Sequence, residues 1–349
     1  MRSGFDGAGV FPGDRREKLR IAISMRDADL SALFTPPVLA RLHEVADLTT
    51  PDVLGRLDTA DAYAALATAE VLLTGWGTPR VDAAVLDHAP KLRAIVHSAG
   101  TVKTFLGDEV FGRGIQVSSA ADANAVPVAE YTLAAIVFGA KRVSRFAHQL
   151  RTRRATRSTK GLPQIGTNGI TLGIVGASRI GRRVIMLARN LDATVLVADP
   201  YLTPSEAAAL GAQAVDLDTL CRRSTVVSVH APQTPATRHL LNARRLALLP
   251  DGAVVINTAR GSIVDTGALT AELVSGRLDA VLDVTDPEPL PPDSPLYDLP
   301  NVLLTPHVAG ALGNEVHRLG EQAVAELERL AAGAPLAHPI HGDELSHIA

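Results

Sequence analysis

Short apolar runs alternate with segments of helical spacing through the first third of the chain. Four runs have the length of a strand, at residues 19–24, 70–74, 92–97 and 114–118. Helical spacing follows the first of them, over residues 30–45. Strands that alternate with helices predict a parallel sheet covered by helices.

A long helix and a change of composition come next. Residues 128–150 have helical spacing, apolar early and basic late, and predict one continuous helix. Residues 151–169 are rich in Arg, Thr and Gly and predict an exposed connection.

The pattern of alternating strands and helices resumes at residue 170. Six apolar runs follow, at 172–175, 194–198, 226–230, 253–257, 280–284 and 302–305. Six strands at this spacing are what a doubly wound dinucleotide-binding sheet needs. A last helix, over about 315–332, comes after that fold is complete, so we expect it to pack on the first unit.

The first strand of the second unit leads into a glycine turn, Thr171-Leu-Gly-Ile-Val-Gly-Ala-Ser-Arg-Ile-Gly181. Such a turn lets backbone N–H groups and a helix N-terminus face a pyrophosphate. Asp199 ends the next strand, where a carboxylate accepts hydrogen bonds from ribose hydroxyls and repels a 2′-phosphate. The glycine turn and Asp199 together predict NAD(H) as the cofactor. Ser178 stands where a glycine usually lets the backbone approach the pyrophosphate, which leaves the pose of the cofactor open.

Three chemically competent side chains follow three later strands. Arg260 comes after the fourth run of the second unit, Glu288 after the fifth and His307 after the sixth. Taken singly, each residue also fits an ordinary loop. Because the carboxyl ends of parallel strands meet at one rim, we expect an anion-binding guanidinium, a carboxylate and an imidazole to converge there.

Five motifs in this order and spacing resemble the D-isomer-specific 2-hydroxyacid dehydrogenases, from about residue 92 to residue 332. They are Gly173-Ile-Val-Gly-Ala-Ser-Arg-Ile-Gly181, Val229-His-Ala-Pro232, Ile256-Asn-Thr-Ala-Arg-Gly-Ser-Ile-Val-Asp265, Leu282-Asp-Val-Thr-Asp-Pro-Glu-Pro289 and Leu304-Thr-Pro-His307. The resemblance implies an α/β protein with two doubly wound parallel-sheet domains. A Rossmann NAD-binding domain over residues 125–310 is inserted into a flavodoxin-like substrate domain, residues 1–124 plus 311–349.

The resemblance also implies roles for individual residues. Arg260 binds the substrate carboxylate and C2 oxygen, His307 is the acid/base and Glu288 pairs with it, while Asp283 lies near the nicotinamide carboxamide. The residues expected to bind the cofactor are Gly176, Ser178, Arg179, Ile180, Gly181, Asp199, His230, Ala231, Pro232, Thr258, Ala259 and Asp283. The residues expected to contact substrate are Trp76, Ser98, Ala99, Gly100 and Arg260.

Some of these assignments have competing interpretations. Trp76, the only tryptophan, is either a wall of the substrate pocket or a packing residue at a turn. The turn at 98–100 either binds a carboxylate through its amides or is a plain glycine turn. After Gly100 many relatives carry an aromatic and then an acidic residue, whereas this chain has Thr101-Val102-Lys103, which leaves the substrate open.

The expected reaction interconverts a D-2-hydroxy acid and a 2-oxo acid by hydride transfer with NAD(H). The alternative is a catalytically weak NAD(H)-sensing binding protein on the same fold. The net charge of −3 disfavours nucleic acid, and the longest clean apolar run, at 132–140, is too short for a membrane span. No metal-ligand motif is visible, and the single cysteine, Cys221, suits a cytoplasmic protein. The resemblance further suggests a homodimer.

Overall fold

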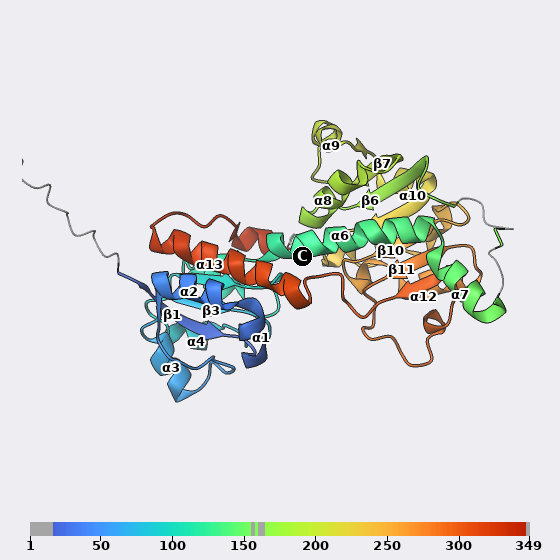
Figure 1. The fold of residues 1–349 in the computed structure, drawn as a ribbon. Helices are drawn as coiled ribbons and strands as arrows, with labels where there is room; N and C mark the ends of the chain where they lie inside the picture. Colours follow the sequence, from blue (N-terminus) through green and yellow to red (C-terminus); the bar gives the residue numbers. More distant parts are fainter. Residues whose placement is uncertain (1–16, 155–157, 160–164, 347–349) are drawn as a thin grey trace, which may run out of the picture.

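The computed structural model describes residues 17–154, 158, 159 and 165–346. Two α/β units lie side by side, one built mainly from the start of the chain and one from its middle (Figure 1). The end of the chain returns to the first unit. Part of the connection predicted at 151–169 lies outside the described residues.

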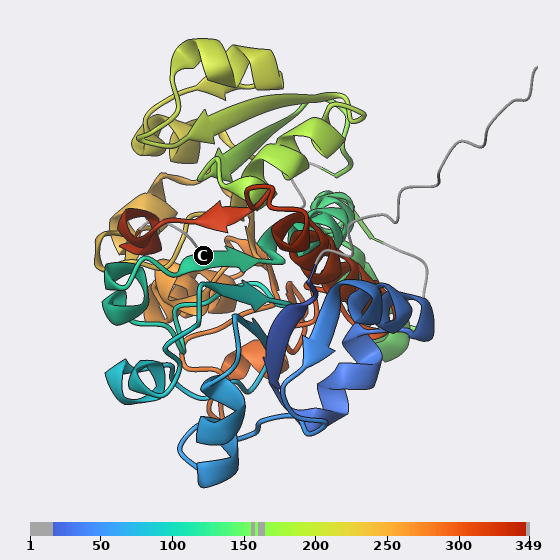
Figure 2. The same ribbon diagram turned by 90° about the vertical axis from the view of Figure 1, so that its left-hand side faces the viewer.

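The first unit contains a six-stranded sheet in the order β13-β5-β4-β3-β1-β2. The four predicted strands are confirmed as β1 (Leu19–Ser24), β3 (Val71–Thr74), β4 (Ala94–His97) and β5 (Gln116–Ser119). Two edge strands were not predicted, β2 (Ala46–Leu48) and β13 (Pro339–Ile340), because Ala-Asp-Leu and Pro-Ile form no apolar run. Strand β13 pairs antiparallel with β5 (Figure 2), so this sheet is not wholly parallel.

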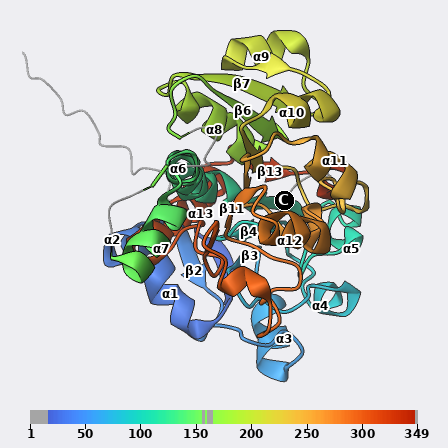
Figure 3. The ribbon, with the colours of Figure 1, turned by 90° about the vertical axis from the view of Figure 1, so that its right-hand side faces the viewer.

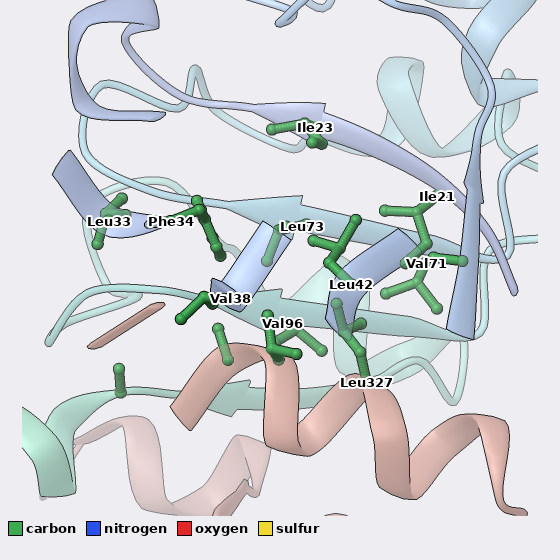
Figure 4. Close-up of a cluster of buried hydrophobic side chains, with 14 of the residues drawn as sticks. Ile21, Ile23, Leu33, Phe34, Val38, Leu42, Val71, Leu73, Val96 and Leu327 are labelled. Atoms are coloured by element: carbon green, nitrogen blue, oxygen red, sulfur yellow. The ribbon is translucent and has the colours of Figure 1, made fainter. Parts of the chain in front are cut away.

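Both faces of the first sheet are covered by helices, because successive side chains of a strand point to opposite faces. Ile21, Leu73 and Val96 face α1 (Asp27–Leu33), α2 (Pro36–Val45) and α13 (His317–Ala331) in the cluster of Figure 4. Their neighbours face α3 (Ala60–Leu66), α4 (Ala83–Asp87) and α5 (Asp108–Gly112). The prediction that the last helix packs on the first unit is confirmed.

The second unit contains a seven-stranded parallel sheet in the order β12-β11-β10-β9-β6-β7-β8. Its strands are β6 (Ile170–Val175), β7 (Ala193–Ala198), β8 (Gln213–Ala214), β9 (Val226–Val229), β10 (Val254–Asn257), β11 (Asp279–Leu282) and β12 (Val302–Leu304). The two-residue β8 was not predicted. The order reverses direction between β6 and β9, which is the doubly wound arrangement expected of a dinucleotide-binding sheet.

The helices of the second unit divide between the two faces of its sheet (Figure 3). Those on one face are α6 (Ala121–Ala140), α8 (Arg179–Ala188) and α9 (Pro204–Leu210). Those on the other face are α10 (Leu217–Arg223), α11 (Ala243–Leu248) and α12 (Thr266–Val274). Helix α6 also contacts α13, so it connects the two units.

The single helix predicted at 128–150 is wrong. Helix α6 ends at Ala140 and a separate helix, α7 (Val143–Arg153), follows it. Between them Arg142 adopts a left-handed conformation with φ of 58°. Its guanidinium lies 3.1 Å from the buried carboxylate of Asp279, which also binds Arg145. This tertiary contact stabilises the break, which follows Gly139 of α6 by three residues.

By length and composition alone, α6 is long and apolar enough to cross a membrane. Half of its apolar window is buried within the protein, as in the core helix of a folded domain. The apolar run at residues 132–140, taken from the sequence as too short for a membrane span, covers only part of this apolar helix.

Candidate active site

Three loops at the carboxyl ends of neighbouring strands form one rim of the second sheet. Arg260 follows β10, Glu288 follows β11 and His307 follows β12. The Nδ1 atom of His307 lies 2.7 Å from Oε1 of Glu288, and both side chains are about half exposed. The structure therefore contains the predicted contact between His307 and Glu288. The loop that carries Glu288 lies beside the loop that carries Arg260.

Asn257 and Gly261 hold the arginine loop in place. The Asn257 side chain donates to the Arg260 carbonyl at 2.9 Å and accepts from the Ala259 amide at 3.0 Å. A Cβ atom on Gly261 would lie 2.0 Å from the Thr285 carbonyl group, so only glycine fits between this loop and the next. The arginine loop and the glutamate loop thus touch through their backbones.

Asp283 organises the loop that carries the histidine. Its buried carboxylate accepts hydrogen bonds from the Thr305 hydroxyl at 2.7 Å and from the amides of Val308 and Ala309 at 2.8 and 2.9 Å. The His307 amide donates to the Asp283 carbonyl, and His307 itself has a positive φ of 56°. Asp283 therefore holds the backbone of the histidine loop in place. Its contact with the nicotinamide stays a prediction.

Burial shapes the electrostatics of Arg260. Burial lowers the pKa of Arg260, and the negative charge of Glu288 partly offsets that effect. An arginine remains charged even so, because its ordinary pKa is far above neutrality. A guanidinium that is largely withdrawn from water binds a carboxylate more strongly than an exposed one.

A pocket of about 830 Å³ opens where the strand order reverses. It brings together five residues predicted to bind the cofactor: Gly176, Ser178, Asp199, Ala231 and Pro232. Its volume lies in the usual range for small-molecule sites. Several lining residues were not predicted, among them Arg182, Tyr201, Val215, Leu217, Thr234, Thr237 and Leu240. The sequence Thr-Pro-Ala-Thr at 234–237 forms a short helix after β9, with Thr234 as its N-cap. This capping pattern is visible in the sequence and could have located these lining residues of the pocket.

The glycine turn fits a dinucleotide. Gly176 has a φ of 95°, and a Cβ atom there would lie 2.6 Å from the Ala231 amide nitrogen. A Cβ on Gly181 would lie 2.1 Å from the Gly176 carbonyl oxygen, so α8 packs directly on the turn. The first turn of α8 presents backbone N–H groups that have no partner within the helix, which suits a pyrophosphate.

Ser178 has a defined role in this turn. Its hydroxyl caps α8 by accepting a hydrogen bond from the Gly181 amide at 3.3 Å. Asp199 stabilises the same turn, since its carboxylate accepts from the Ala177 amide at 2.6 Å and the Tyr201 amide at 2.8 Å. The carboxylate is therefore held at the edge of the pocket.

The side chains of several other residues expected to bind the cofactor contact neighbouring protein groups. His230 is buried, contacts the Ser228 hydroxyl through Nε2 at 2.8 Å, and has its pKa lowered by burial to about 3. Arg179 pairs with Asp122 at 3.3 Å, and Ile180 packs on the hydrophobic core. The Thr258 hydroxyl binds Thr132 of α6 at 2.9 Å, and Ala259 is buried. Contact of these residues with the cofactor stays a prediction.

The turn at 98–100 directly follows β4. The Ser98 hydroxyl and amide both donate to the Thr74 carbonyl at 2.8 Å, so they are occupied. The amides of Ala99 and Gly100 donate to none of the described residues, as binding of a carboxylate by this turn requires. Trp76 packs partly buried on the core cluster of the first unit, which favours the packing interpretation of that residue.

No group of three or more potential metal-ligating side chains occurs within the described part of the chain. The doubly wound sheet, the glycine turn and the apolar pocket at the reversal of strand order together define a dinucleotide-binding α/β protein.

Comparison with known proteins identifies the family. Residues 133–309 match the family model described as "D-isomer specific 2-hydroxyacid dehydrogenase, NAD binding domain". The chain is 36% identical over 275 residues to a D-3-phosphoglycerate dehydrogenase of Mycobacterium tuberculosis, a match covering 78% of this chain and 51% of the relative. It is 34% identical over 262 residues to a glyoxylate reductase of Aeropyrum pernix, covering 73% and 78% of the two chains.

A solved structure agrees with these sequence matches. The TT0316 protein of Thermus thermophilus superposes with a TM-score of 0.72 at 33% identity, covering 92% of this chain and all of the other. The chain belongs to the D-isomer-specific 2-hydroxyacid dehydrogenase family, and its cofactor is NAD(H). It spans about half the length of the phosphoglycerate dehydrogenases that it matches.

Proposed function

We propose that this protein is an NAD(H)-dependent oxidoreductase that interconverts a D-2-hydroxy acid and a 2-oxo acid. The observation that carries the proposal is the 2.7 Å contact between His307 and Glu288 on the rim that also bears Arg260. Membership of the family supports the same assignment.

In the reductive direction, His307 acts as the general acid. Because Nδ1 of the ring faces the Glu288 carboxylate, Nδ1 carries a proton and Nε2 is the atom that donates to the substrate oxygen. Glu288 orients the ring through this contact. In oxidation the neutral ring takes the hydroxyl proton through the same Nε2 atom.

Arg260 and the turn at 98–100 bind the carboxylate and C2 oxygen of the substrate. In this proposal the guanidinium comes from the second unit, and the amides of Ala99 and Gly100 come from the first. Together they hold the carbonyl carbon in one orientation. NADH, when bound, supplies the hydride that reduces this carbon.

NADH oxidation by a panel of 2-oxo acids tests the proposal, with glyoxylate, hydroxypyruvate, pyruvate and phenylpyruvate as probes. We expect turnover of at least one of them, and His307→Ala is expected to lower the rate of the chemical step by at least about 100-fold. The exposed His43 provides a matched control, His43→Ala. Tight NADH binding without turnover by the wild type would instead indicate an NAD(H)-sensing binding protein.

The organisation of the chain is part of the same proposal. We infer that residues 125–310 form the NAD(H)-binding domain and that residues 1–124 with 311–349 form the substrate domain. Supporting this, Asn124 accepts a hydrogen bond from the Ala311 amide at 2.9 Å, so the two proposed crossings between domains lie together. We further propose a cytoplasmic homodimer whose partner molecules are small hydroxy and oxo acids, not nucleic acid or membrane.

A further inference from the structure

Three hydrogen-bonded side chains join helix α6 to the loop that carries His307. The phenol oxygen of Tyr131, in α6, lies 2.6 Å from the hydroxyl oxygen of Thr305. The Thr305 hydroxyl in turn lies 2.7 Å from Oδ1 of Asp283. Tyr131 precedes Thr305 by 174 residues in the chain, and the proposed mechanism gives it no role.

The direction of both hydrogen bonds follows from the protons that are available. A carboxylate only accepts hydrogen bonds, so Thr305 donates its single hydroxyl proton to Asp283. Thr305 can then only accept from Tyr131, and the phenol is the donor. Burial raises the pKa of Tyr131 above its ordinary value near 10, so the phenol keeps its proton at neutral pH.

Helix α6 is a firm support for this phenol. The ring of Tyr131 packs, partly buried, on a hydrophobic core cluster of the second unit. The next residue, Thr132, donates to the Val128 carbonyl at 2.7 Å and accepts from the Thr258 hydroxyl at 2.9 Å. Helix α6 is therefore hydrogen-bonded to the loops after β10 and β12, the two that carry the arginine and the histidine.

Asp283 passes this support on to the histidine loop. Its Oδ1 atom accepts from both Thr305 and the Val308 amide, and its Oδ2 atom accepts from the Ala309 amide. These two amides come directly after His307, whose own amide donates to the Asp283 carbonyl. The rotation of the Asp283 carboxylate therefore decides where the backbone beside His307 lies, and the Thr305 hydroxyl fixes that rotation.

We propose that Tyr131 is a positioning residue for the reaction, which fixes the place of the His307 ring through Thr305 and Asp283. The proposal rests on the dehydrogenase function inferred above. Loss of the phenol hydroxyl then slows the proton transfer by His307, because that step requires the imidazole at a defined distance from the substrate oxygen. Binding of substrate and cofactor changes little, because Asn257 holds the arginine loop and α8 packs on the glycine turn.

Single-turnover kinetics of Tyr131→Phe test the proposal. The NADH-bound protein is mixed with a 2-oxo acid that the wild type reduces, and the loss of NADH absorbance is followed. We expect the rate constant to fall about 10-fold, with KM values for both substrates within about 2-fold of the wild type. The amplitude should not change, because misplacement of the ring slows every site, whereas partial unfolding removes sites and lowers the amplitude.

Further variants assign the effect to the hydrogen-bonded chain. We expect Thr305→Val to be at least as slow as Tyr131→Phe, and Thr305→Ser to retain most of the wild-type rate. The double variant Tyr131→Phe/Thr305→Val should be no slower than Thr305→Val, since Tyr131 acts through Thr305. Tyr63→Phe, in α3 of the first unit, is the matched control. A wild-type rate constant in Tyr131→Phe, or two effects that multiply in the double variant, overturns the proposal.

Hydrogen exchange separates the failure of this proposal from the failure of the proposed function. Exchange of the Val308 and Ala309 amides, followed by mass spectrometry of peptides that contain them, reports on the loop without any turnover. We expect it to be at least about 5-fold faster in Tyr131→Phe and unchanged in Tyr63→Phe. Unchanged exchange in Tyr131→Phe overturns the proposal whatever the activity. Faster exchange in a protein that reduces no 2-oxo acid supports the anchoring of the loop and contradicts the proposed function alone.

Discussion

Individual residues at this site depend on neighbours that are remote in the sequence. His307 is aligned by Glu288 and by Asp283, which both lie in the loop after β11. Ser178, at the middle glycine position of the dinucleotide fingerprint, caps a helix through its hydroxyl. The substitution therefore replaces backbone freedom at the turn with a defined contact at the helix end.

Two buried histidines make stability depend on pH. Burial lowers the pKa of His97 and of His230 from the ordinary 6.5 to about 3. In the unfolded chain both rings take up protons below about pH 6.5, whereas in the folded protein they stay neutral until about pH 3. Stability is therefore full above pH 6.5 and is lost as the pH falls, by about 1.4 kcal/mol for each histidine and each pH unit.

Denaturant unfolding between pH 7 and pH 5 checks this expectation. His97→Gln and His230→Gln, each compared with the wild type, should reduce the slope of unfolding free energy against pH. His43→Gln, at an exposed position, should leave that slope unchanged. Equal slopes in all four proteins would show that the two buried rings are not the source of acid sensitivity.

Among elements, the loops that bear Arg260 and Glu288 depend on close backbone packing. Gly261 lies against the Thr285 carbonyl group, and the Thr266 hydroxyl donates to the Asp286 carbonyl at 2.8 Å. The two loops are therefore one packed unit, which explains how residues from different strands keep a common geometry.

Gly261→Ala tests this packing. Its Cβ atom would overlap backbone atoms, so we expect about 1–3 kcal/mol of destabilisation together with a lower kcat/KM. Gly267→Ala is the matched control, because its nearest neighbour would lie 3.6 Å away, an ordinary contact. Thermal unfolding and steady-state kinetics of both variants provide the comparison, and a Gly261 variant as stable and active as the control would contradict the packing argument.

For the whole molecule, α6 and α7 carry exposed apolar side chains, where we expect the proposed dimer contact. Phe138, Val143 and Leu150 are 50%, 36% and 63% exposed. Apolar groups of this size on consecutive helices favour a protein–protein contact over exposure to water. Figure 1 shows α6 and α7 along the second unit.

Sedimentation velocity tests the proposed dimer. We expect the wild type to sediment as a dimer and Phe138→Asp to shift it toward the monomer, because a charge buried in an apolar interface is unfavourable. Val274→Asp, at an exposed position on α12, should not change the sedimentation coefficient. A monomeric wild type, or a dimer unaffected by the Phe138 change, would exclude this interface.

The sequence by itself determined the strands, the reversal of strand order and the rim on which Arg260, Glu288 and His307 meet. These features are encoded locally, by apolar periodicity and by the rule that parallel strands end at one edge. It did not predict β2, β8 or β13, because Ala-Asp-Leu, Gln-Ala and Pro-Ile form no apolar run, whereas the comparably short β12 is the wholly apolar Val-Leu-Leu.

Only the tertiary structure decided how side chains are used. The break at Arg142 depends on Asp279, and the burial of His230 and the pairing of Arg179 with Asp122 depend on packing between elements. Such contacts join residues that are far apart in the chain, so no local pattern records them, and the free energy of the folded packing selects them.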